Sequence, residues 1–239
     1  MKALRIVSIT LAAVLAAGVF VAAAGAGAPA EPQSVDPTDF TDPKPNPYFP
    51  LVPGTISIYR GTEEHERLLE RLTITHETKM ILGVTTTVVH DIIWANGLLA
   101  EKTTDWYAPD NDGNVWYFGE ATAVYDEQGH VITTEGSWEA GVEGAIAGTI
   151  MPADPHPTDA YRQEIYPGHA EDQAWIVQRH AKVRVPYGRF DHVVRSFEWT
   201  RLEPHVMAAK LYAPGLGIVR EFDVVGGTEL LELVKVRSI

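Results

Sequence analysis

The chain has 239 residues, of which 45% are hydrophobic and 21% charged, a balance typical of globular proteins. It contains no cysteine, which excludes disulfides, thiolate metal sites, cysteine nucleophiles and a lipid-modified cysteine. The formal net charge is −13. A chain this acidic is a poor partner for nucleic acid and for an anionic lipid surface.

The first 30 residues have the pattern of a secretory signal peptide. Lys2 and Arg5 precede an apolar run from Ile6 to Ala24, and two small-x-small cleavage sites follow, the second ending at Ala30. We expect cleavage there, which leaves a net charge of −15 and no stable membrane span. An uncleaved anchor is the alternative, because the run approaches the ~20 residues that span a bilayer. Both interpretations make the protein secreted or periplasmic, outside the cytoplasm.

Residues 31–45 are rich in proline and are predicted to form an extended tether, because proline lacks the N–H that helices and central strands require. The apolar residues Tyr48, Phe49 and Leu51 follow and are expected to pack over one end of the folded domain. Residues 46–239 show no internal repeat and no further shift in composition. They are predicted to form a single domain.

This domain is predicted to be all-β. Runs rich in Val, Ile, Thr, Trp and Tyr alternate with turn dipeptides, as expected of an antiparallel meander curled into an open or closed barrel around a pocket. One or two short helices are expected, at Glu63–Leu69 and Thr158–Tyr166. The expected strands are Thr55–Arg60, Arg71–Ile81, Thr85–Ala95, Leu98–Ala108, Asn114–Tyr125, His130–Glu139, Val142–Met151, Gln173–Val185, His192–Thr200, Val206–Ala213, Gly217–Val225 and Glu229–Val236.

The register of the first hairpins decides whether two histidines meet. If residues 96–97 form a two-residue turn, His90 lies opposite Thr103. A three-residue turn at residues 82–84 puts His76 opposite His90. A two-residue turn there would instead place His76 opposite Val89 and on the other face of the sheet.

The next hairpin is expected to bring two carboxylates together. A two-residue turn at residues 112–113 places Asp105 opposite Glu120 and Tyr107 opposite Phe118. Side chains directly across a ladder lie ~5 Å apart, and alternation adds Trp116 to the same face. One face is therefore predicted to carry a site made of His76, His90, Asp105 and Glu120, with a substrate pocket of Tyr107, Trp116 and Phe118.

A face that mixes polar and large apolar side chains is typical of a pocket rather than of a solvent-exposed surface. Two imidazoles and two carboxylates suit one divalent transition metal, such as zinc, copper, iron or manganese. Without a metal, repulsion between Asp105 and Glu120 raises the pKa of one carboxyl and leaves a proton donor beside a proton acceptor. The simpler alternative is that the histidines are solvent-exposed and the aromatic residues only pack in the core.

Residues 211–221 (LYAPGLGIVRE) and 229–233 (ELLEL) resemble the closing hairpin of bacterial envelope proteins with a lipoprotein-localisation-factor-like open β-barrel, and the hairpin of residues 105–120 is similar to segments of secreted relatives. The resemblance implies an antiparallel sheet curled around an apolar cavity that holds lipid or another hydrophobic molecule. The lipidation cysteine is absent and the proline-rich segment is long, both departures from the family pattern. No catalytic residue is carried over.

Two functions follow from these patterns. The first is a metal-dependent enzyme that acts on a small molecule, with Asp105 and Glu120 as the catalytic pair. The second is a non-catalytic carrier of a lipid or another hydrophobic ligand. The acidic and histidine residues of the expected inner face favour the first, because a carrier would line its cavity with Val, Leu and Ile.

Overall fold

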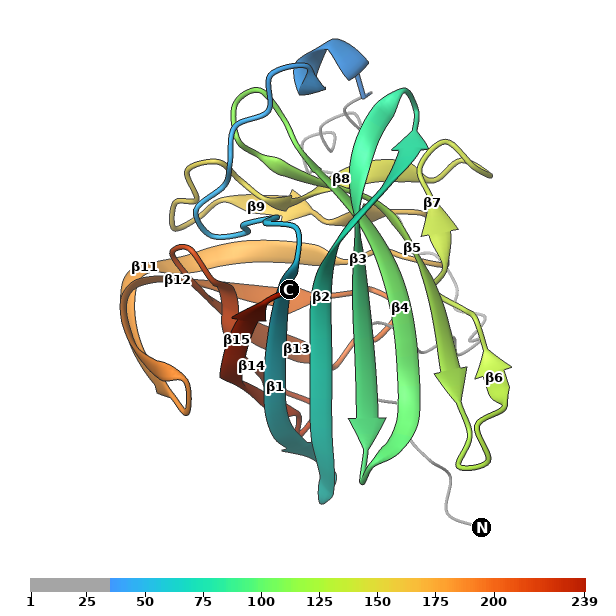
Figure 1. Cartoon of the computed structure of the whole chain (residues 1–239), viewed down its shortest axis with the longest axis vertical. Coiled ribbons are helices and arrows are strands. Elements are labelled where there is room, and N and C mark those ends of the chain that lie inside the picture. Colours follow the sequence, from blue (N-terminus) through green and yellow to red (C-terminus); the bar gives the residue numbers. More distant parts are fainter. Residues whose placement is uncertain (1–34) are drawn as a thin grey trace, which may run out of the picture.

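The runs of β-branched and aromatic residues form strands that pair into one antiparallel sheet, which curls into a barrel (Figure 1). The computed structural model describes residues 35–239, so the signal peptide expected over residues 1–30 lies outside the described residues. The strands are β1 (Thr55–Glu63), β2 (Glu66–Ile81), β3 (Val84–Ala95), β4 (Leu98–Pro109), β5 (Val115–Tyr125), β6 (Val131–Thr133), β7 (Trp138–Glu139), β8 (Ile146–Met151), β9 (Ala160–Arg162), β10 (Glu164–Ile165), β11 (Gln173–Val185), β12 (Gly188–Trp199), β13 (Met207–Ala213), β14 (Gly217–Val225) and β15 (Leu230–Ser238).

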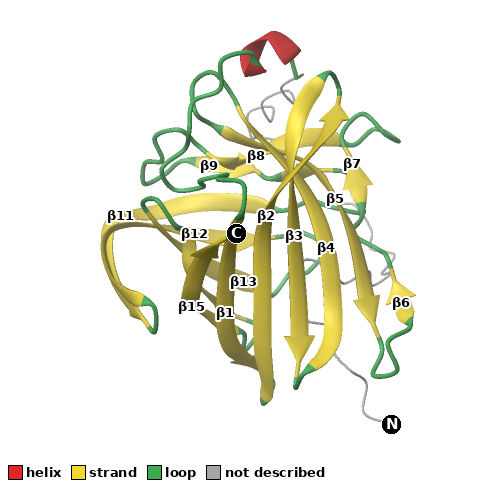
Figure 2. Ribbon diagram, viewed as in Figure 1, coloured by secondary structure: helices red, strands yellow, loops and turns green. Residues whose placement is uncertain are grey.

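The predicted all-β class is confirmed, and each of the expected strand segments contains a strand. Both predicted helices are wrong. Residues 63–69 form the β1–β2 hairpin, because Glu64 and His65 adopt the positive φ angles of a tight turn and the burial of Leu68 and Glu70 alternates as in a strand. Residues 158–166 contain β9 and β10. Within residues 35–239 the helical segment is a single 3-10 turn, η1 (Pro37–Phe40), drawn red in Figure 2.

One short segment closes the barrel. Neighbouring strands follow the order β10-β8-β5-β4-β3-β2-β1-β15-β14-β13-β12-β11-β9. The two ends of this path, β10 and β9, are consecutive in the chain and join at the buried Gln163. Residues 160–165 therefore pair with β11 on one side and with β8 on the other. The sheet is thereby nearly closed into a barrel, although β11 pairs with β9 only over residues 173–175 and continues to residue 185 with β12 as its strand partner.

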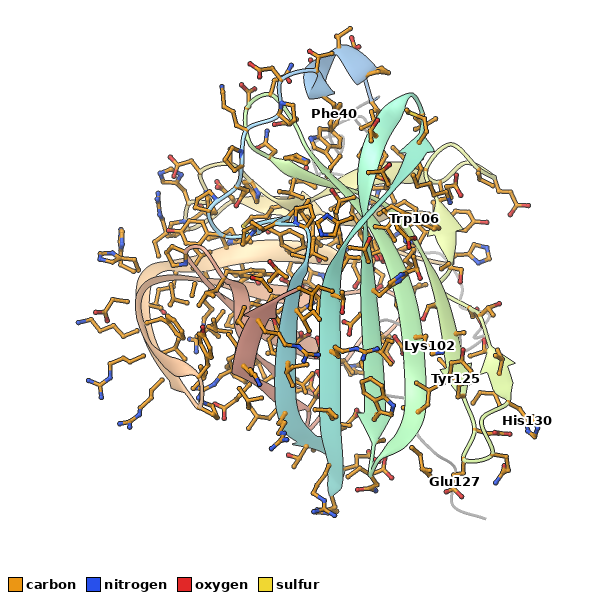
Figure 3. All side chains as sticks on the ribbon, in the orientation of Figure 1. Phe40, Lys102, Trp106, Tyr125, Glu127 and His130 are labelled. Atoms are coloured by element: carbon orange, nitrogen blue, oxygen red, sulfur yellow. The ribbon has the colours of Figure 1, made fainter. Side chains whose placement is uncertain are left out.

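The proline-rich segment lies against one end of the barrel. Phe40 of η1, labelled in Figure 3, packs edge-on against Trp116 and Phe118, with ring centroids 6.0 and 5.7 Å apart. Buried Asn46 donates hydrogen bonds to the carbonyls of Gly113 and Pro152. The predicted packing of Tyr48, Phe49 and Leu51 on the core is confirmed. The domain boundary expected at residue 46 stays a prediction, although η1 already contacts the barrel.

Alternation along each strand sends different chemistry to the two faces. On β4 the exposed Lys102 points outward, its Nζ 5.9 Å from the ring centroid of Tyr125 on β5 (Figure 3), whereas its neighbours Glu101 and Thr103 are buried. The barrel interior thus contains acidic residues, whose burial costs free energy that exposure on the outer face would not. Two apolar clusters, one around Phe118 and Tyr212 and one around Leu233, form the rest of the core.

Closure depends on a glycine. A Cβ at Gly148 in β8 would lie 2.2 Å from the carbonyl oxygen of Gln163. We expect Gly148→Ala to lower the free energy of unfolding by about 1–3 kcal/mol, the usual cost of overpacking, as measured by urea denaturation. Gly188→Ala is the control, because its Cβ would meet the Phe190 ring at an ordinary 3.4 Å. Equal effects of the two substitutions would contradict this account of the closure.

Candidate binding site

The two histidines do not meet. The β2–β3 turn has two residues, with Ile81 paired to Val84, and a register shift follows between Ile74 and Thr78. His90 therefore lies opposite Thr73 on β2, and the predicted pairing of His76 with His90 is wrong.

On the β4 side, a bulge moves His90 opposite Thr104 rather than Thr103, so that prediction is also wrong. Bulges of this kind shift pairing by one residue and are set by tertiary packing, which the turn dipeptides do not report.

Both histidines lie apart from the carboxylates. His90 is half-buried, with Nδ1 3.2 Å from Oγ1 of Thr104. His76 is exposed, and its Nε2 would lie 3.2 Å from a Cβ placed on Gly54. Neither lines the barrel interior. Within residues 35–239 no three or more His, Asp or Glu side chains are arranged to hold a metal ion.

The two carboxylates do meet. Asp105 pairs directly with Glu120, as predicted, and both line the barrel interior. A bulge after Asp105 places Tyr107 opposite Tyr117 rather than Phe118, so this part of the register prediction is wrong. The two tyrosine rings are stacked, with centroids 4.6 Å apart.

Of the three aromatic residues predicted for the substrate pocket, Tyr107 lines the interior. Trp116 and Phe118 do not, because they pack under Phe40 at the end of the barrel. The sequence analysis missed Tyr117, which the bulge before Tyr107 turns toward the interior.

The barrel interior holds a cavity of about 120 Å³, which we call the acidic chamber. Its wall carries nine carboxylates, and Lys210 is the basic side chain among the described residues that line it. The carboxylates are those of Glu70, Asp91, Glu101, Asp105, Glu120, Glu164, Asp172, Glu198 and Glu221. They come from strands spread over the whole chain, so hairpin register alone could find only neighbouring members.

Lys210 neutralises one corner of the chamber. Its Nζ lies 3.2 Å from Glu198 and 3.4 Å from Glu221. Ser196 and Tyr212 donate hydrogen bonds of 2.6 and 2.8 Å to the same oxygen of Glu198. Burial acts to raise the pKa of Glu198, but the charge of Lys210 and these hydrogen bonds outweigh it and lower that pKa. Glu198 is therefore ionised, and Lys210, Ser196 and Tyr212 satisfy its carboxylate.

The other carboxyls resist ionisation. Burial raises the pKa of Asp105 to about 6, of Asp91 and Glu164 to about 7, and of Glu101 to about 8. Burial, followed by repulsion from neighbouring carboxylates, also raises the pKa of Glu120 well above its ordinary value. Near neutral pH the chamber therefore holds protons that free carboxyls would have released.

Several carboxylate oxygens in the wall have no hydrogen-bond partner. They are Oδ1 of Asp91, Oε2 of Glu164 and Oδ1 of Asp172. Glu164 is only 2% exposed, and its other oxygen accepts a hydrogen bond of 3.3 Å from Nε1 of Trp138. Within the chamber, a protonated neighbouring carboxyl can donate to two of these oxygens, from Glu70 to Asp91 and from Glu120 to Glu164. When those neighbours ionise, the buried oxygens lose these donors, which is costly unless something else supplies them.

An apolar cavity of about 250 Å³ adjoins the acidic chamber, and we call it the antechamber. The two share Phe49, Leu72, Tyr107 and Ile218 in their walls. Residues 49–52, which follow the proline-rich segment in the chain, form part of the antechamber wall. Together they form an amphiphilic space, with an apolar part beside an acidic part.

Comparison with known proteins gives fold neighbours alone. No family model and no curated protein matches the chain. One similar structure is a candidate exported protein with a YmcC-like fold from Bacteroides fragilis, 15% identical over 82% of this chain and 99% of that one, with a TM-score of 0.45. Another is a candidate lipoprotein from Parabacteroides distasonis, 10% identical over 81% of this chain and 100% of that one, with a TM-score of 0.46. Neither similarity carries a function over to this chain.

Residues 35–239 include no helix that is long and apolar enough to cross a membrane.

The raised pKa values predict how stability depends on pH. A carboxyl whose pKa is higher in the folded state binds more protons there, so folding stability falls as pH rises from the unfolded value near 4 through the folded values. We expect the melting temperature to be higher at pH 5 than at pH 8. A melting temperature that rises over this interval would overturn the assignment of protonated carboxyls.

Glu120→Gln removes one such carboxyl and should flatten the dependence, so that the free energy of unfolding at pH 8 is higher than that of the unmodified protein. Glu127→Gln is the control, because Glu127 is exposed at the β5–β6 turn (Figure 3). Its pH profile should follow that of the unmodified protein.

Proposed function

We propose that this protein is an extracytoplasmic binding protein for a small organic cation, one that joins a protonated amine or a similar group to an apolar portion. The observation that carries the proposal is the surplus of buried carboxyls, nine of which face a single lysine, with an oxygen of Glu164 that only a protonated neighbouring carboxyl can satisfy. An ammonium group has three donors and no acceptor, so it matches this wall. Location outside the cytoplasm is supported by the signal-peptide pattern of residues 1–30.

The aromatic rings and the antechamber favour an amphiphilic cation over a bare one. Tyr107 and Tyr117 line the acidic chamber, where their ring faces attract cations. The antechamber supplies apolar wall for a hydrocarbon portion of the ligand. The two volumes, about 250 and 120 Å³, together correspond to the lower end of the ~300–1,000 Å³ range of ligand pockets, so the ligand is small.

Isosteric ligands with different charges test this proposal. We expect hexylamine to bind, hexanol to bind at least tenfold more weakly, and hexanoate not to bind, as measured by isothermal titration calorimetry at pH 8. Hexylamine stays cationic from pH 5 to pH 8, so its affinity should rise over this interval as the chamber carboxyls ionise. Hexanol binding as tightly as hexylamine would instead support the carrier of neutral hydrophobic ligands.

Glu164→Gln should weaken hexylamine binding at least tenfold, about 1.4 kcal/mol, because it replaces the buried, unpartnered acceptor by an amide. Glu127→Gln, at the exposed β5–β6 turn, should leave binding unchanged. Identical affinities in the two variants would place the cation away from the chamber.

Acid–base catalysis by Asp105 and Glu120 is a second candidate function. Tyr117 donates a 2.7 Å hydrogen bond to Oδ1 of Asp105. Burial raises the pKa of Asp105 to about 6, while that of the facing Glu120 is raised well above its ordinary value. Near neutral pH this pair would hold one ionised base and one protonated acid, the arrangement that general acid–base catalysis uses.

Amino esters with a six-carbon chain test the catalytic candidate, because they combine the proposed cation with a bond that a base-activated water can cleave. Catalysis predicts hydrolysis above the buffer rate that Asp105→Asn abolishes while hexylamine still binds. Mn²⁺ and Zn²⁺ form a second arm, since the metal-dependent form of this function would now rest on Asp105 and Glu120 without His76 and His90. Hydrolysis at the buffer rate in every arm would leave binding as the function to pursue.

A further inference from the structure

Two strands of the barrel bulge at the same place. The register of β11 and β12 shifts between the pairs Gln178↔Arg195 and Ala181↔Val193, with the extra residue on β11, and again between Ala181↔Val193 and Val183↔Phe190, with the extra residue on β12. His180 and His192 lie at these bulges with φ angles of 57° and 60°, in the left-handed region that residues with a side chain seldom adopt. Both are exposed, on the hairpin that Figure 1 draws in orange.

The bulges turn the two imidazole rings toward each other. Nδ1 of His180 lies 3.0 Å from Nδ1 of His192, and the rings meet edge to face at 88°. If both rings are neutral, one N–H donates to the other nitrogen. The hydroxyl of Tyr48 also donates a 3.4 Å hydrogen bond to the carbonyl of His192. Two left-handed residues at one exposed place cost free energy, and such strain is often found at binding sites.

We propose that His180 and His192 form a two-imidazole binding site for Cu²⁺ on the outer surface of the barrel. Metal–nitrogen bonds of about 2.0 Å separate two ligands by about 2.8–2.9 Å in adjacent square-planar positions and by about 3.3 Å in a tetrahedron. The observed 3.0 Å is nearer to the square-planar value, which Cu²⁺ and Ni²⁺ prefer. Among divalent first-row metals, Cu²⁺ binds such nitrogen ligands most tightly.

The surroundings leave the site open. Water can fill the remaining positions, because both rings are exposed. Asp191 precedes His192 on β12. Its carboxylate lies 3.8 Å from Nζ of Lys182, which is too far for a short ion pair. By contrast, His156 contacts Arg179 at 2.9 Å through Nε2, and His130 contacts Asp126 at 3.2 Å through Nδ1. This site shares no residue with the acidic chamber, so it stands or falls independently of the proposed function.

Cu²⁺ titration of the purified protein at pH 7.4, with glycine as a weak competitor, tests the site. We expect one equivalent to bind and its electron paramagnetic resonance spectrum to show coupling to two imidazole nitrogens. His180→Asn and His192→Asn should each weaken binding at least tenfold. Asparagine tolerates left-handed backbone, so these variants keep the bulges.

The double variant His180→Asn/His192→Asn measures copper held elsewhere, for example by the terminal amine. His130→Asn is the control and should bind Cu²⁺ as the unmodified protein does, since His130 is exposed on another hairpin. Unchanged affinity in both single variants, or coupling to a single imidazole nitrogen, would overturn the proposal. Circular dichroism of each variant confirms that a loss of binding is not a loss of fold.

Discussion

The interior of this barrel depends on keeping carboxyl groups out of water with too few positive charges to neutralise them. Nine carboxylates line the acidic chamber and one lysine faces them. Ionising all of them at once would require several unpaired buried charges, each of which costs far more than the folded state can supply. The structure resolves this in two ways. Lys210 keeps Glu198 charged, and protons neutralise carboxyls whose pKa values burial has raised, Glu221 among them.

The closure of the barrel and the assembly of the chamber are one event. The segment that joins β9 to β10 brings Glu164 into the interior, and the chain then turns back with Asp172 beside it. Both carry an unpartnered oxygen. A barrel left open between β8 and β11 would expose these groups to water and return their pKa values toward ordinary ones. The acidity of the site is thus a property of the closed fold rather than of any single strand.

The strand positions and one part of the site could be predicted from the sequence. Turn dipeptides and period-two patterning located the hairpins, and the pairing of Asp105 with Glu120 follows from the turn at residues 112–113. Bulges limited how much of the site could be predicted from the sequence. One extra residue in β5, between Tyr117 and Glu120, sent Tyr117 inward in place of Phe118, and extra residues in β2 between Ile74 and Thr78 separated His76 from His90. The positions of such insertions are determined by packing across the barrel. The contribution of Glu198 and Lys210 was also hidden, because they come from strands about a hundred residues away in the chain.

A chamber of this kind distinguishes ligands by whether their binding makes its carboxyls release protons. A neutral molecule that enters leaves the carboxyls protonated and gains only apolar contact. A cation changes the balance, because each carboxyl that ionises beside it exchanges a proton for a charge-assisted hydrogen bond. Most of the chamber carboxylates belong to buried residues, and attraction between charges is stronger where less water surrounds them. In the proposed function, the same burial that makes the chamber unfavourable for ionised carboxyls makes it selective for a ligand that brings positive charge on an apolar body.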